Sequence, residues 1–148
     1  GEDEFRQSTP RAWELLTAPG ATNKAEYVQQ WIDGLHEWGS PEFADESRWT
    51  ADAEAAFDRC FDPSGVKRQF EAVGRSGSRA ERLPGVTVPT LVIHGDKDNL
   101  IFAIGGERTA ALIPGARFEL IAGMGHDYPP QLWRQWTDLV VGHIRAHS

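Results

Sequence analysis

Residues 86–98, VTVPTLVIHGDKD, carry the strongest fold signal in this sequence. Their uninterrupted, β-branched core at 90–93 is typical of a strand that is buried on both faces in a parallel sheet. A second strand is expected at 117–121, with a short helix at 105–113 before it. A longer helix is expected at about 130–147, with Trp133 and Ile144 on its inner face. This alternation of strand and helix predicts a parallel α/β arrangement. Two strands are, however, too few for an independently stable sheet.

The residues before this pattern read as short helices separated by turns. The clearest one is expected at 23–38. Its apolar residues have the spacing of one helical face, namely Val28, Trp31, Ile32 and Leu35. Thr50 is expected to cap a later helix, and Asp62 followed by Pro63 predicts the start of another.

A polar, glycine-rich stretch at 74–85 (GRSGSRAERLPG) marks the best internal boundary. We therefore expect a helical segment with its linker over 1–84 and an α/β segment over 85–148. The 148 residues suffice for one ordinary domain.

Composition excludes several function classes. The chain has 15 Lys+Arg against 22 Asp+Glu and a net charge of -7, which argues against a nucleic-acid or anionic-membrane surface. No apolar run approaches the roughly 20 residues that span a bilayer, and the acidic N-terminus does not resemble a secretory signal. The single cysteine, Cys60, excludes an internal disulfide and is expected to be a core thiol. We therefore expect a cytoplasmic protein.

Two polar motifs directly follow the two expected strands. HGDKD at 94–98 follows the first strand, and GMGH at 123–126 follows the second. Open α/β sheets place their active sites beyond the carboxyl ends of the strands. A carboxylate and a histidine on these loops can meet, so that the carboxylate fixes the imidazole tautomer and the other nitrogen acts as a general base.

The segments VPTLVIHGDKD and IPGARFELIAGMGH, followed by an amphipathic terminal helix, resemble the C-terminal third of the α/β-hydrolase core. The resemblance covers about 83–144 and implies that Asp98 is the acid and His126 the base of a Ser-His-Asp triad. It also implies that the preceding helices form the lid of a serine hydrolase of the esterase type. Hydrolysis would then need no cofactor, and small-molecule esters, including methyl esters of aromatic natural products, are the expected substrates.

The triad's nucleophile is missing from the sequence. No Gly-x-Ser-x-Gly segment occurs, and the nearest string, around Ser76, lacks a preceding buried strand. Together with the resemblance, the missing nucleophile predicts a C-terminal fragment that is inactive without its N-terminal part. We expect the bare strand edge to be covered by that part as a second chain, or by another copy in a homodimer. The first residue, Gly1 rather than methionine, favours processing or truncation.

Alternative interpretations remain open at this stage. Asp96 could take the role of the acid, and the ligand types of the two loops could hold zinc or iron, although their spacing suits no metal shell and none is expected. His94 is expected to be structural. Trp31 or Trp38 could line an apolar substrate pocket. A non-catalytic module that binds a small ligand on the same scaffold is the alternative function.

Overall fold

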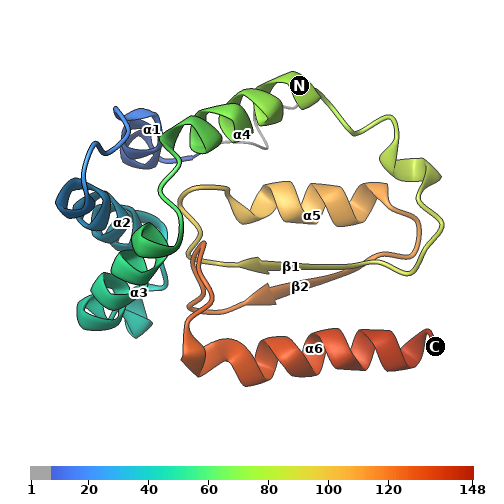
Figure 1. The fold of residues 1–148 in the computed structure, drawn as a ribbon. Coiled ribbons are helices and arrows are strands. Elements are labelled where there is room, and N and C mark those ends of the chain that lie inside the picture. Colours follow the sequence, from blue (N-terminus) through green and yellow to red (C-terminus); the bar gives the residue numbers. More distant parts are fainter. Residues whose placement is uncertain (1–7) are drawn as a thin grey trace.

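The computed structural model describes residues 8–148, with five longer helices, one short helix and two strands in this part of the chain. The elements are α1 (Pro10–Thr17), α2 (Lys24–Trp38), α3 (Glu46–Arg59), α4 (Pro63–Ser76), β1 (Leu91–Gly95), α5 (Ala103–Leu112), β2 (Arg117–Ile121) and α6 (Trp133–Ala146), with 3-10 turns at Pro41–Phe43, Leu83–Gly85 and Pro130–Leu132. In Figure 1, α1, α2 and α3 gather at one end of the molecule, beside the loops that follow the strands.

The starts of the helices follow local capping chemistry. The Asn23 side chain accepts the Glu26 N–H at 3.0 Å and so caps α2. Pro63 occupies the first turn of α4 behind Asp62, as expected. The prediction that Thr50 caps a helix is wrong. Asp45 caps α3 five residues earlier by accepting the Arg48 N–H, which leaves Thr50 inside the helix.

The two strands form the expected parallel pair. Leu91 lies opposite Arg117 and Gly95 lies opposite Ile121, so the carboxyl ends of both strands coincide. Helix α5 connects the strands and packs against them at Gly106, where a Cβ atom would lie only 2.7 Å from His94 Nδ1. Helices α5 and α6 run along either side of the strands (Figure 1). Within residues 8–148, β1 pairs with β2 alone, and its second edge has no strand partner.

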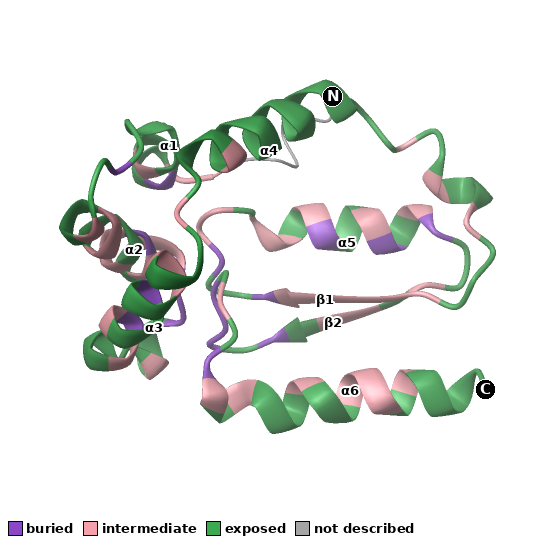
Figure 2. Ribbon diagram, viewed as in Figure 1, coloured by how far each residue is buried: buried purple, intermediate pink, exposed green. Residues whose placement is uncertain are grey.

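Burial is concentrated where the first helices meet the loops after the strands. Figure 2 shows buried residues in these loops and on α1, α2, α3 and α5, and none on α4 or α6. Trp133 and Ile144 were expected on an inner face of the last helix, but they are 58% and 57% exposed. Cys60, expected in the core, is also exposed. Both predictions fail because amphipathic patterning identifies an apolar face without supplying what covers it.

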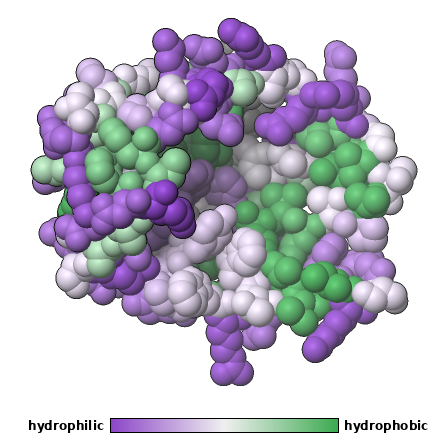
Figure 3. Space-filling model, viewed as in Figure 1, coloured by the Kyte–Doolittle hydropathy of each residue, from purple (hydrophilic) through white to green (hydrophobic). Residues whose placement is uncertain are grey.

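The uncovered apolar faces are visible at the surface. Val66, Phe70 and Val73 of α4 are 71%, 44% and 58% exposed. Figure 3 shows apolar surface on both sides of a hollow in this face of the molecule. Exposed apolar residues that gather on one surface are typical of sites that contact other protein. No helix among the described residues is both long and apolar enough to cross a membrane.

Candidate active site

Asp98 lies in the loop after β1, and its carboxylate is almost fully buried, with the residue 7% exposed. Oδ1 accepts the backbone N–H groups of Leu100 at 2.9 Å and Ile101 at 2.8 Å. Oδ2 lies 2.7 Å from His126 Nδ1 and 3.2 Å from His94 Nε2. Both oxygens are thus engaged by two donors each, which is the arrangement that holds a buried carboxylate in its ionised form.

Burial and hydrogen bonding shift the pKa of Asp98 in opposite directions. Burial raises the pKa, because it disfavours the charged form. The hydrogen bonds from His126, His94 and the Ile101 N–H favour the charged form, and together they outweigh burial. The pKa of Asp98 is therefore held well below its ordinary value, and the carboxylate stays negative at neutral pH.

His126 lies in the loop after β2, where its side chain is 44% exposed. The loop leaves the strand through Gly123, whose φ of 77° is a left-handed conformation that favours glycine. Because Nδ1 of His126 faces the carboxylate of Asp98, Nδ1 carries a proton and Nε2 is the nitrogen that can take one up. This is the orientation that a general base of the Ser-His-Asp type requires.

His94, which is expected to be structural, contacts the same carboxylate. Its Nε2 lies 2.8 Å from the Ile101 carbonyl oxygen and 3.2 Å from Asp98 Oδ2, so this nitrogen carries the proton. The pKa of His94 is raised, chiefly by its hydrogen bond to Asp98 and against the effect of burial. The sequence signal for this contact was the spacing of four residues between His94 and Asp98. The loop after β1 folds back on the end of its own strand, which brings the two side chains together.

Asp96 connects the two loops and does not face the histidine. Its Oδ1 accepts the Gly123 N–H at 2.7 Å, and the neighbouring Lys97 N–H donates to the Met124 carbonyl at 2.9 Å. The structure thus places Asp98, and not Asp96, against His126. Among the described residues, no three histidine, cysteine or acidic side chains are grouped as a metal ion would require.

The remaining candidates are two tryptophans of α2 and a serine at the end of α4. Trp31 is partly exposed on α2, where its ring packs near Tyr27 at 5.9 Å between centroids. Trp38 is the last residue of α2; its ring lies over Gly34, and its carbonyl oxygen accepts the His126 N–H. Ser76 ends α4, so it is not on a turn from a strand into a helix.

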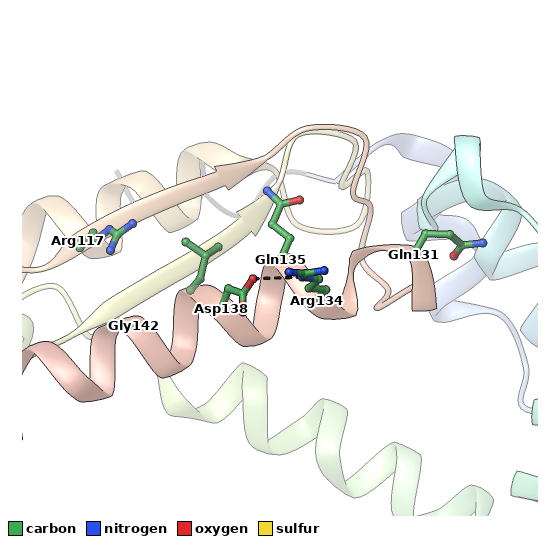
Figure 4. Close-up of a pocket in the computed structure, with 7 residues that line it drawn as sticks. Arg117, Gln131, Arg134, Gln135, Asp138 and Gly142 are labelled. Carbon is green, nitrogen blue, oxygen red and sulfur yellow. Dashed lines mark ion pairs between the residues drawn. The ribbon is translucent and has the colours of Figure 1, made fainter.

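A groove of about 570 Å³ runs between α6 and the start of β2. Figure 4 shows its lining, including the ion pair between Arg134 and Asp138 at 3.8 Å. Asp98 and His126 do not line this groove, so it is separate from the candidate site.

Comparison with known proteins supports the fold independently of the site. No protein-family model matches the sequence. Among solved structures, an esterase from Rhodococcus sp. ECU1013 matches all of this chain and 52% of its own length, with a TM-score of 0.69 and 14% identity. A meta-cleavage product hydrolase from Pseudomonas fluorescens IP01 matches 97% of this chain and 52% of its own, with a TM-score of 0.64 and 17% identity.

A third structure, 2-hydroxy-6-oxo-6-phenylhexa-2,4-dienoate hydrolase from Rhodococcus sp. strain RHA1, matches 93% of this chain and 50% of its own length, with a TM-score of 0.63 and 18% identity. The chain therefore has the fold of the C-terminal part of an α/β-hydrolase, as the sequence predicts. It spans about half the length of these enzymes.

Proposed function

We propose that these residues form the C-terminal half of a serine hydrolase, an ester hydrolase, in which Asp98 is the acid and His126 the base. The observation that carries the proposal is the buried carboxylate of Asp98, 2.7 Å from Nδ1 of the half-exposed His126. Both residues lie at the carboxyl ends of parallel strands, where this class of sheet places its chemistry. In this proposal residues 1–84 form the lid and its linker, and 85–148 belong to the core.

The geometry supports a defined sequence of proton transfers. Nε2 of His126 takes the proton of a serine hydroxyl as its oxygen attacks the ester carbonyl, and Asp98 stabilises the imidazolium that forms. His126 then gives this proton to the leaving alcohol, which leaves an acyl-serine. Water attacks the acyl-serine, His126 again accepts and returns a proton, and the carboxylic acid departs. Asp98 remains ionised throughout, as its lowered pKa permits.

The serine and the oxyanion hole come from outside these 148 residues, because no Gly-x-Ser-x-Gly segment occurs in the sequence. We propose that this missing part pairs with the second edge of β1, on the same polypeptide or on another. A homodimer that covers the edge instead would leave the triad incomplete. By itself the chain would therefore have no triad chemistry.

The substrate proposed is a small-molecule ester. Trp38 is the better of the two predicted pocket residues, because its carbonyl oxygen is 2.6 Å from the backbone nitrogen of His126. Trp31 lies two helical turns earlier on the same face of α2. The location proposed is the cytoplasm, where a lone thiol such as Cys60 stays reduced.

The test is esterase activity of the native protein that contains these residues, measured with p-nitrophenyl acetate. His126→Ala and Asp98→Ala are each expected to lower kcat by about 10⁴-fold, since triad members act as a unit. The matched control is His143→Ala on α6, which is expected to leave kcat unchanged. Activity that survives His126→Ala, or a 148-residue chain that is itself an active esterase, would overturn the proposal.

A further inference from the structure

Three consecutive residues attach the loop of His126 to the end of α2. The Gly125 N–H donates to Ser40 Oγ at 2.9 Å, and the His126 N–H donates to the Trp38 carbonyl at 2.6 Å. Asp127 Oδ1 accepts two hydrogen bonds from Ser40, one from its backbone N–H at 2.8 Å and one from its hydroxyl. This set of contacts spans more than eighty residues of sequence.

Ser40 lies at the centre of these contacts. It is 1% exposed, and its hydroxyl both donates to the Asp127 carboxylate and accepts from Gly125. A hydrogen bond to a charged acceptor is roughly twice as strong as one between neutral groups. The buried hydroxyl is therefore used both as a donor and as an acceptor, and its two partners directly precede and follow His126 in the sequence.

The backbones of the two segments meet directly. A Cβ atom on Gly125 would overlap the carbonyl carbon of Gly39 and the carbonyl oxygen of Trp38. The three atoms nearest to such a Cβ all belong to the backbone. Because the contact is backbone against backbone, a shift of the end of α2 must be passed on to His126.

The loop of the acid is attached to the same helix end. The Asn99 side chain donates to the Glu37 carbonyl at 3.0 Å, one residue before the carbonyl that His126 uses. The last carbonyl groups of a helix have no partner within the helix. At the end of α2, two of them are satisfied by the loops that carry the proposed acid and base.

We infer that Ser40 and Asp127 are positioning residues, which hold the imidazole of His126 on the carboxylate of Asp98 by fixing its loop to α2. The helical segment then sets the geometry of the acid–base pair. The catalytic meaning of this inference rests on the proposed function, but the positioning itself is measured without turnover of a substrate.

The experiment is nuclear magnetic resonance of the native protein that contains these residues, which measures solvent exchange of the His126 Nδ1 proton. Asp127→Ala removes two hydrogen bonds and is expected to speed this exchange at least about three- to tenfold, the factor that corresponds to one of them. The His94 Nε2 proton, on the same carboxylate, is expected to keep its rate. Asp127→Asn retains an oxygen for Ser40 and is expected to stay within twofold of the wild-type rate.

The control is Asp58→Ala, which removes the ion pair of Lys24 with Asp58 between α2 and α3, away from the His126 loop. It is expected to leave the His126 proton unchanged. If Asp127→Ala does not fold, Ser40→Ala replaces it, because the Ser40 N–H still donates to Asp127; the same acceleration is expected.

Unchanged exchange of the His126 proton in the tested variant, or equal acceleration of the His94 proton, overturns the positioning role. Absence of a protected His126 Nδ1 proton from the wild type would instead contradict the acid–base pair, and hence the proposed function. The two failures are therefore distinguishable.

Discussion

Replacing Asp98 with asparagine should measure how strongly the buried carboxylate is bound. Asparagine keeps one oxygen for the N–H groups of Leu100 and Ile101 but puts an NH₂ group where Oδ2 faces His126 and His94. Two hydrogen bonds to a charged acceptor are lost, each contributing about 1.5 kcal/mol at the lower end of its usual range, so the free energy of unfolding is expected to fall by about 3 kcal/mol.

The assay is urea unfolding at pH 7, followed by tryptophan fluorescence. With a slope of about 2 kcal/mol per molar urea, the midpoint of Asp98→Asn is expected about 1.5 M below that of the wild type. The matched control is Asp96→Asn in the same loop, which keeps an acceptor for the Gly123 N–H. Its free energy of unfolding is expected within about 0.5 kcal/mol of the wild type.

The stability difference between wild type and Asp98→Asn should also depend on pH in a defined direction. The pKa of Asp98 is lowered in the folded state, so its ionisation stabilises the fold above the unfolded-state pKa of about 3.9 and this stabilisation is lost as pH falls toward the folded-state pKa. The gap between wild type and Asp98→Asn should therefore narrow below about pH 4. A gap under about 0.5 kcal/mol at pH 7, or one that is constant down to pH 3, would refute the reasoning.

Three further predictions concern other contacts. Gly125→Ala places a Cβ against Gly39 and is expected to lower the free energy of unfolding by about 1–3 kcal/mol in urea titrations; an unchanged midpoint would contradict the close approach. His94 has a raised pKa, so its protonation stabilises the fold below about pH 6.5, and the stability difference from His94→Gln should shrink as pH rises through the folded-state pKa; a difference that grows with pH would be the wrong sign. Thr9→Ala removes the cap of α1, which accepts the Ala12 N–H at 3.0 Å, and should cost about 1 kcal/mol by calorimetry; no loss would exclude the cap.

The core segment was predictable because its signals are local. The strands at 117–121 and around 90–95 are short segments bounded by glycine and proline, and these boundary residues can be recognised without knowing which residues the strands contact. The pairing of Asp98 with His126 followed from topology, since parallel strands bring their carboxyl ends together. Their roles as acid and base remain a prediction.

The contacts that sequence reasoning missed depend on distant partners. Ser40 and Asp127 are 87 positions apart, and neither residue type marks a site by itself. The start of α3 was misplaced because Asp45 and Thr50 are both good caps and only the backbone decides between them. The exposure of Cys60 and Trp133 could not be foreseen, because periodicity indicates a face and not its partner.

The most direct test asks whether the serine of the triad lies outside these 148 residues. The native protein is labelled with a fluorophosphonate, which forms a covalent bond only with an activated serine. The labelled peptide is then identified by mass. We expect the label on the serine of a Gly-x-Ser-x-Gly segment outside residues 1–148, and loss of labelling in His126→Ala. A label on a serine within these 148 residues, or labelling that persists without His126, would contradict the proposal that this chain supplies only the acid and the base.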